Sequence, residues 1–128
     1  MLKATDLMVG NIVNVIPSGL PIRIAAVHNR KVAYHSVVHR LEWVREAHLE
    51  PIPLTREILE KNGLKFDSEY DFKHFDGDNG YLLELNVNEN GEVWWTMEYG
   101  EYEIFQIKYV HQLQNIMKAL GIKKEINL

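Results

Sequence analysis

The chain has 128 residues, of which 46% are hydrophobic and 25% are charged, and it contains no cysteine. This length and composition predict one globular domain rather than a disordered segment. The lack of cysteine excludes a disulfide scaffold, a thiolate nucleophile, a zinc site of cysteine type and an iron–sulfur cluster.

The net charge of −4 is divided unevenly along the chain. Residues 1–50 hold six Lys/Arg and four Asp/Glu, whereas residues 51–128 hold eight and fourteen. The small basic excess of the first part is far below that of a dedicated DNA-binding domain. No apolar run is long enough for a membrane span or a signal peptide, so we expect a cytoplasmic protein without membrane contact.

The first 50 residues read as short strands separated by turns. Turns are expected at Pro17-Ser18-Gly19 and at Asn29-Arg30-Lys31. Several short strands at this spacing predict a small, curved, barrel-like antiparallel β unit. The expected strands are Asn11–Ile16, Ile22–His28 and Val32–Val38, with Leu41–Val44 as an extension of the third or as a fourth.

The segment after Pro53 predicts a short helix over Arg56–Asn62. Thr55 is a good N-cap, and the leucines on either side of it have the spacing of a hydrophobic staple. Gly63 stands where a left-handed residue would end the helix.

Residues 65–80 read as irregular. Within them, Asp76–Gly80 lacks the glycine and glutamate spacing of a calcium loop and is read as a turn.

Asn90-Gly91 between two alternating runs predicts a β-hairpin, for which two registers are possible. A two-residue loop would pair Leu85 with Thr96 and mix polar and apolar side chains on both faces. A three-residue loop, Glu89–Gly91 with Gly91 at positive φ, pairs Leu85 with Trp95, and we predict this register. It collects one apolar face from these pairs: Tyr81–Tyr99, Leu83–Met97, Leu85–Trp95 and Val87–Val93.

A turn near Gly100 is expected to lead into a strand over Tyr102–Lys108, and a last helix is expected over Val110–Leu120, closed by Gly121. The predicted fold class is therefore α+β. We expect a single domain over residues 1–128, with a β unit at 1–50 and a helix, a hairpin sheet and a C-terminal helix in 51–128.

Motifs that carry chemistry are missing from the sequence. There is no Gly-x-Ser-x-Gly elbow, no His-Glu-x-x-His pattern and no glycine-rich phosphate loop. His35 and His39 would stand about 13 Å apart on a strand, too far to share one metal ion. We therefore expect neither enzymatic activity nor a metal or cofactor, and an enzyme whose site is assembled from distant residues is an alternative.

A mixed apolar and basic surface in the first part is the candidate binding site. If His35–Trp43 stays extended, alternate residues from His35 to Trp43 share one side. Arg and Trp are typical both of protein hot spots and of nucleic-acid stacking, although the apolar members could instead be core. The candidate binding residues are Arg30, Lys31, His35, His39, Arg40 and Trp43.

Three stretches resemble a family of small uncharacterised proteins of gut anaerobic bacteria, often encoded near phage or mobile elements. They are Asp6–Asn11, Leu49–Gly63 and Tyr109–Asn115, and with their spacing they span nearly the whole chain. The resemblance implies a genomic setting and no mechanism. We expect a non-enzymatic interaction module with a protein partner, and weak binding of nucleic acid by the basic N-terminal strands is the alternative.

Overall fold

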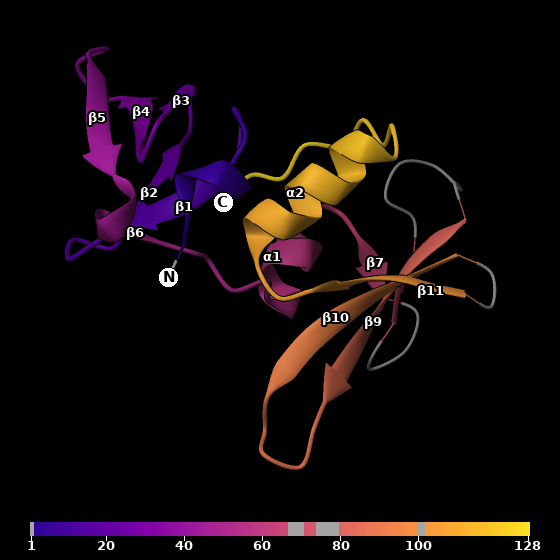
Figure 1. Ribbon diagram of the computed structural model, residues 1–128. Helices are drawn as coiled ribbons and strands as arrows, with labels where there is room; N and C mark the ends of the chain where they lie inside the picture. The colour runs from indigo at the N-terminus through magenta and orange to yellow at the C-terminus, as the bar shows by residue number, and fades with distance from the viewer. Residues whose placement is uncertain (1, 67–70, 74–79, 100–101) are drawn as a thin grey trace. The chain divides into compact units, whose positions relative to one another are not determined.

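The computed structural model describes residues 2–66, 71–73, 80–99 and 102–128 (Figure 1). The described residues form three antiparallel sheets and two α-helices, which confirms the predicted α+β fold class. The chain divides into two compact units, Met1–Ile52 and Pro53–Leu128. No helix in the described ranges combines the length and the apolar character that crossing a membrane requires.

The N-terminal unit consists of short strands and two single-turn 3-10 helices. Its two sheets have the strand orders β2-β1-β6 and β3-β4-β5. The elements are η1 (Ala4–Asp6), β1 (Ile12–Val15), β2 (Leu20–Arg23), β3 (Ala26–His28), β4 (Lys31–His35), β5 (Leu41–Arg45), η2 (Glu46–His48) and β6 (Leu49–Glu50).

The strand expected over Ile22–His28 is two strands, because the chain passes from one sheet to the other at Ile24 and Ala25. The Ile24 N–H donates to the Asn11 carbonyl at 2.9 Å, and the Ala25 N–H donates to the Ala33 carbonyl at 2.8 Å. Ile24 is 1% exposed and belongs to the core of this unit. The expected curved β unit is thus built from two sheets joined by this crossing segment.

The condition that His35–Trp43 stays extended is not met, and the strand expected over Val32–Val38 ends before Ser36. Strand β4 ends at His35, and Leu41 opens β5 as the fourth strand that the sequence left as an alternative. The Ser36 N–H donates to the Arg40 carbonyl at 2.8 Å, and the His39 N–H donates to the Ser36 carbonyl at 2.9 Å. A three-residue loop therefore reverses the chain, with His39 in the left-handed region at φ 60.

The C-terminal unit holds a five-stranded antiparallel sheet with the order β11-β10-β9-β8-β7 and both α-helices. Strands β7 and β8 lie where the sequence reads as irregular, which corrects that reading. The expected turns at Asp76–Gly80, apart from Gly80, and at Gly100 lie outside the described residues. The elements are α1 (Arg56–Lys61), β7 (Lys65–Phe66), β8 (Asp71–Lys73), β9 (Tyr81–Val87), β10 (Val93–Tyr99), β11 (Tyr102–Ile107) and α2 (Val110–Ala119).

Both helices are closed by the predicted glycines, and each ends one residue earlier than expected, at Lys61 and at Ala119. The Thr55 hydroxyl accepts from the Ile58 N–H at 3.2 Å at the start of α1. Gly63 has φ 83, and the next residue donates its N–H to the Leu59 carbonyl at 3.1 Å. Gly121, with φ 73, follows α2 in the same way.

His111 in α2 is buried and its ring stacks on Tyr109, with centroids 5.9 Å apart.

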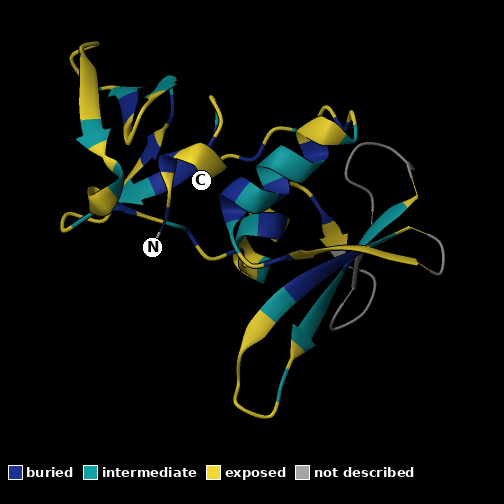
Figure 2. Cartoon of the chain, in the orientation of Figure 1, coloured by how far each residue is buried: buried dark blue, intermediate teal, exposed yellow. Residues whose placement is uncertain are grey.

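The predicted hairpin register is confirmed, since Leu85 pairs with Trp95 and Gly91 has φ 79. The Asn88 side-chain oxygen accepts from the backbone N–H groups of Asn90 and Glu92 at 2.9 Å each, which fixes the three-residue loop. Burial is complete in the middle of the apolar face and decreases towards the tip (Figure 2), where Val87 is 56% exposed.

Candidate functional site

The second sheet of the N-terminal unit presents one face to solvent, which we call the outer face. Antiparallel pairing places directly opposed residues on the same side of a sheet. The registers β3–β4 and β4–β5 therefore define three rows of side chains across the three strands. The rows are His28, Lys31 and Arg45; then Ala26, Ala33 and Trp43; then His35 and Leu41.

The opposite, inner face explains why these residues point outwards. Val32 is fully buried in the core, and Val27 and Val44, which oppose it, pack against the same core. Side chains alternate between the faces of a strand, so burying this row turns the neighbouring rows outwards. In Figure 2 most of β5 is accordingly drawn as exposed.

Trp43 is the largest side chain of the outer face and is 48% exposed. It opposes Ala33, which is fully buried, and its ring meets the His28 ring edge-on with centroids 6.5 Å apart. Leu41 at the far row is 49% exposed. The alternative that the apolar members of the candidate site are core is therefore wrong for Val37, Leu41 and Trp43, all of which are exposed. An exposed tryptophan beside cationic side chains is typical of binding surfaces.

The structure brings together only part of the predicted site. Lys31, His35 and Trp43 share the outer face, as the rows show. Arg30 lies in the turn between β3 and β4, and His39 and Arg40 lie in the loop between β4 and β5. His28 was not among the predicted residues. The turn signal at Asn29-Arg30 could have found it, because a two-residue turn there pairs His28 with Lys31.

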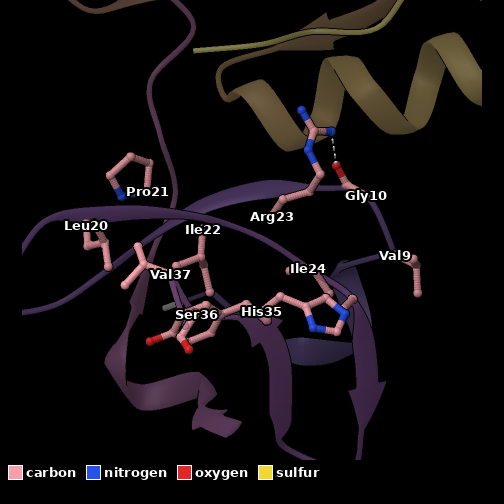
Figure 3. Close-up of a pocket in the computed structure, with 12 residues that line it drawn as sticks. Val9, Gly10, Leu20, Pro21, Ile22, Arg23, Ile24, His35, Ser36 and Val37 are labelled. Atoms are coloured by element: carbon pink, nitrogen blue, oxygen red, sulfur yellow. Dashed lines mark hydrogen bonds between the residues drawn. The ribbon is translucent and has the colours of Figure 1, made fainter. Parts of the chain in front are cut away.

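An open hollow of about 580 Å³ lies in the same unit. Val9 and Gly10, residues 20–25 and residues 34–37 line it (Figure 3), so both sheets contribute. This volume is in the range of ligand-binding pockets, which are mostly apolar with a few polar groups. The sequence analysis did not identify the hollow, because its lining comes from three separate segments.

The hollow has an apolar rim and a cationic group. Val9 is 58% exposed, Leu20 52% and Val37 97%. The Arg23 guanidinium donates to the Gly10 carbonyl at 3.0 Å, as Figure 3 shows. Such a lining can accept an aliphatic side chain of another molecule and exclude water around it. His35 is the one predicted site residue among its lining residues.

His39→Gly is expected to stabilise the protein by about 0.5–1 kcal/mol. His39 holds φ 60, a conformation that costs a side chain about 1–2 kcal/mol and that glycine adopts freely, while the entropy of the unfolded glycine offsets part of the gain. Chemical denaturation of the two proteins measures the difference. Asn29→Gly, at φ 54, is the matched control and should gain less, since asparagine tolerates this region better. A destabilised His39→Gly protein would contradict the proposed loop conformation.

Within the described ranges, no three His, Asp or Glu side chains come close enough to hold a metal ion together. Comparison of the chain with protein-family models, with curated proteins and with solved structures finds no match.

Proposed function

We propose that this protein is a cytoplasmic, non-enzymatic protein-interaction module that binds through its N-terminal unit. The resemblance of its three sequence stretches suggests that it serves a phage or another mobile element. The observation that supports the proposal is the exposed Trp43 on the outer face, at 48% exposure and with Leu41 in the next row.

The composition of this surface favours a protein partner. Interface hot spots are rich in Trp and Arg, surrounded by contacts that exclude water. Trp43 and Arg45 supply these residue types on β5, and the open hollow with its rim at Val9, Leu20 and Val37 offers a second place for an apolar side chain. Two neighbouring apolar features in one small unit suit a partner that inserts aliphatic or aromatic groups.

Selection from a library of random peptides tests the proposal. The folded 128-residue chain should enrich peptides with apolar anchors above the background of an unrelated protein. A double variant, Leu41→Ser with Trp43→Ser, removes the exposed apolar groups of the outer face and should retain few of these peptides. The control is the variant Val87→Ser with Val93→Ser. It removes two apolar side chains at the β9–β10 hairpin that are about as exposed as Leu41 and Trp43.

Nucleic-acid binding is the alternative that a salt titration decides. Labelled DNA and RNA would be titrated at about 50 and about 200 mM salt, because contacts to several phosphates weaken steeply over this range. Submicromolar binding that falls by about a hundredfold at the higher salt would contradict a protein partner. The small basic excess of residues 1–50, six Lys/Arg against four Asp/Glu, is the reason to expect no such binding.

A further inference from the structure

We propose that the outer face binds an extended acidic peptide segment, in which apolar residues lie two and four positions from an acidic residue. This inference rests on the protein-interaction function proposed above and specifies the chemistry of the partner. Charge complementarity and the spacing of the three rows carry it.

The charges of the outer face are of one sign. Lys31 lies between His28 and Arg45 in the first row, and the three rows contain no carboxylate. Glu42, the acidic residue of β5, opposes Tyr34 on the inner face. Among the described residues, neither Lys31 nor Arg45 forms an ion pair. An acidic group of a partner is therefore the complement that this row lacks.

The rows have the spacing of an extended peptide. Residues two apart along a strand are separated by about 6.6–6.8 Å, so the Trp43 row lies about 7 Å and the Leu41 row about 13 Å from the basic row. A peptide in extended conformation has the same rise, and its residues i, i+2 and i+4 point to the same side. An acidic residue at i on the basic row thus places i+2 near Trp43 and i+4 near Leu41.

The same rows suit a nucleic acid less well. A phosphate backbone requires cations spread along its track, whereas Lys31 and Arg45 are directly opposed at one end of the face. The second row holds two alanines and Trp43, and the third holds His35 and Leu41. A surface that is basic at one end and apolar at the other matches a side-chain sequence of acidic and apolar residues.

A charge-reversal selection tests this pairing. Wild type should enrich random library peptides with Asp or Glu two and four residues from apolar positions. The variant Lys31→Glu with Arg45→Glu should enrich Lys or Arg at that position instead. Lys108→Glu with Lys123→Glu makes the same change in net charge at exposed positions of the C-terminal unit and should keep the acidic pattern.

Affinity measurements on one enriched peptide complete the test. Fluorescence anisotropy should show at least about a tenfold loss of affinity for Trp43→Ala, because an exposed hot-spot tryptophan supplies much of the binding energy. Circular dichroism and thermal unfolding report whether each variant is folded. If the double glutamate variant fails to fold, Lys31→Gln with Arg45→Gln removes the charges without reversing them and should lose the acidic preference.

The outcomes separate this inference from the proposed function. Enriched peptides without an acidic residue, or with a pattern that charge reversal leaves unchanged, would overturn the acidic partner and leave the interaction module standing. A wild-type selection that enriches no peptide would overturn both. Tight oligonucleotide binding that the charge reversal abolishes would assign the outer face to nucleic acid and would also overturn the inference.

Discussion

Replacing Trp95 with alanine is expected to lower the free energy of unfolding by about 3–5 kcal/mol. Trp95 is 1% exposed and lies on the central part of β10, opposite Leu85 on β9 and Ile107 on β11. Its indole N–H donates to the Leu54 carbonyl at 2.8 Å, just before α1. The substitution removes a large buried ring and also the hydrogen bond that ties the start of α1 to the sheet. Denaturant unfolding measures the loss.

Two further variants interpret this result. Trp95→Phe deletes the N–H and part of the ring, so its cost of about 1–3 kcal/mol combines the lost hydrogen bond to the Leu54 carbonyl with the smaller buried side chain. Trp43→Ala removes the same side chain from a site that is 48% exposed and should cost less than half as much as Trp95→Ala. Equal losses for the two tryptophans would contradict the burial that distinguishes them.

The β9–β10 hairpin could be predicted to the level of register because two kinds of local signal agree there. Asn90-Gly91 marks the turn, and the alternation around it is compatible with one loop length only. A one-residue slip would turn the apolar side chains of one of the two strands to solvent. Leu83 on β9 and Met97 on β10 are both fully buried, so either choice would be costly. Helix α1 could be predicted for a similar reason, since Thr55 and Gly63 mark its two ends.

The β4–β5 hairpin could not be predicted because its loop has no typical turn residue at the critical position. Residues 37–39 are Val-Val-His, and His39 takes the left-handed conformation that glycine usually provides. The reversal is closed by Ser36, whose backbone and hydroxyl both bond to Arg40. Strands β7 and β8 were missed for a different reason: two or three residues show no alternation to recognise.

The candidate site was partly predictable, although the loop between β4 and β5 was not. In an extended strand, residues 35, 41 and 43 share a side because they are an even number of positions apart. The three-residue loop keeps that relation, because it pairs His35 with Leu41 and Ala33 with Trp43. Positions 37 and 39 leave the face and move into the loop. The pairing with β3 that adds His28, and the hollow, depend on contacts between segments that a linear pattern does not contain.

Leu83→Ala is expected to cost about 2–5 kcal/mol, and Leu85→Ala distinctly less. Both leucines lie on the same face of β9, so the change in strand propensity is the same for the two substitutions. The two sites differ in burial. Leu83 is fully buried opposite Met97, whereas Leu85 is only half-buried opposite Trp95. The sequence pattern alone predicts the full core cost at Leu85, because it places the whole face in the core.

Chemical denaturation of the two variants decides between these views. Removing a buried leucine costs the transfer free energy of its methyl groups and leaves a cavity. A half-buried leucine already contacts water, so its removal costs less transfer free energy and leaves a smaller cavity. A larger loss at Leu83 with an unchanged denaturant slope would support a core that is centred on Leu83 and Met97 and thins towards the tip. Equal losses would mean that burial extends as far as Leu85 in solution, and that the exposed part of the hairpin begins only at Val87, which is 56% exposed.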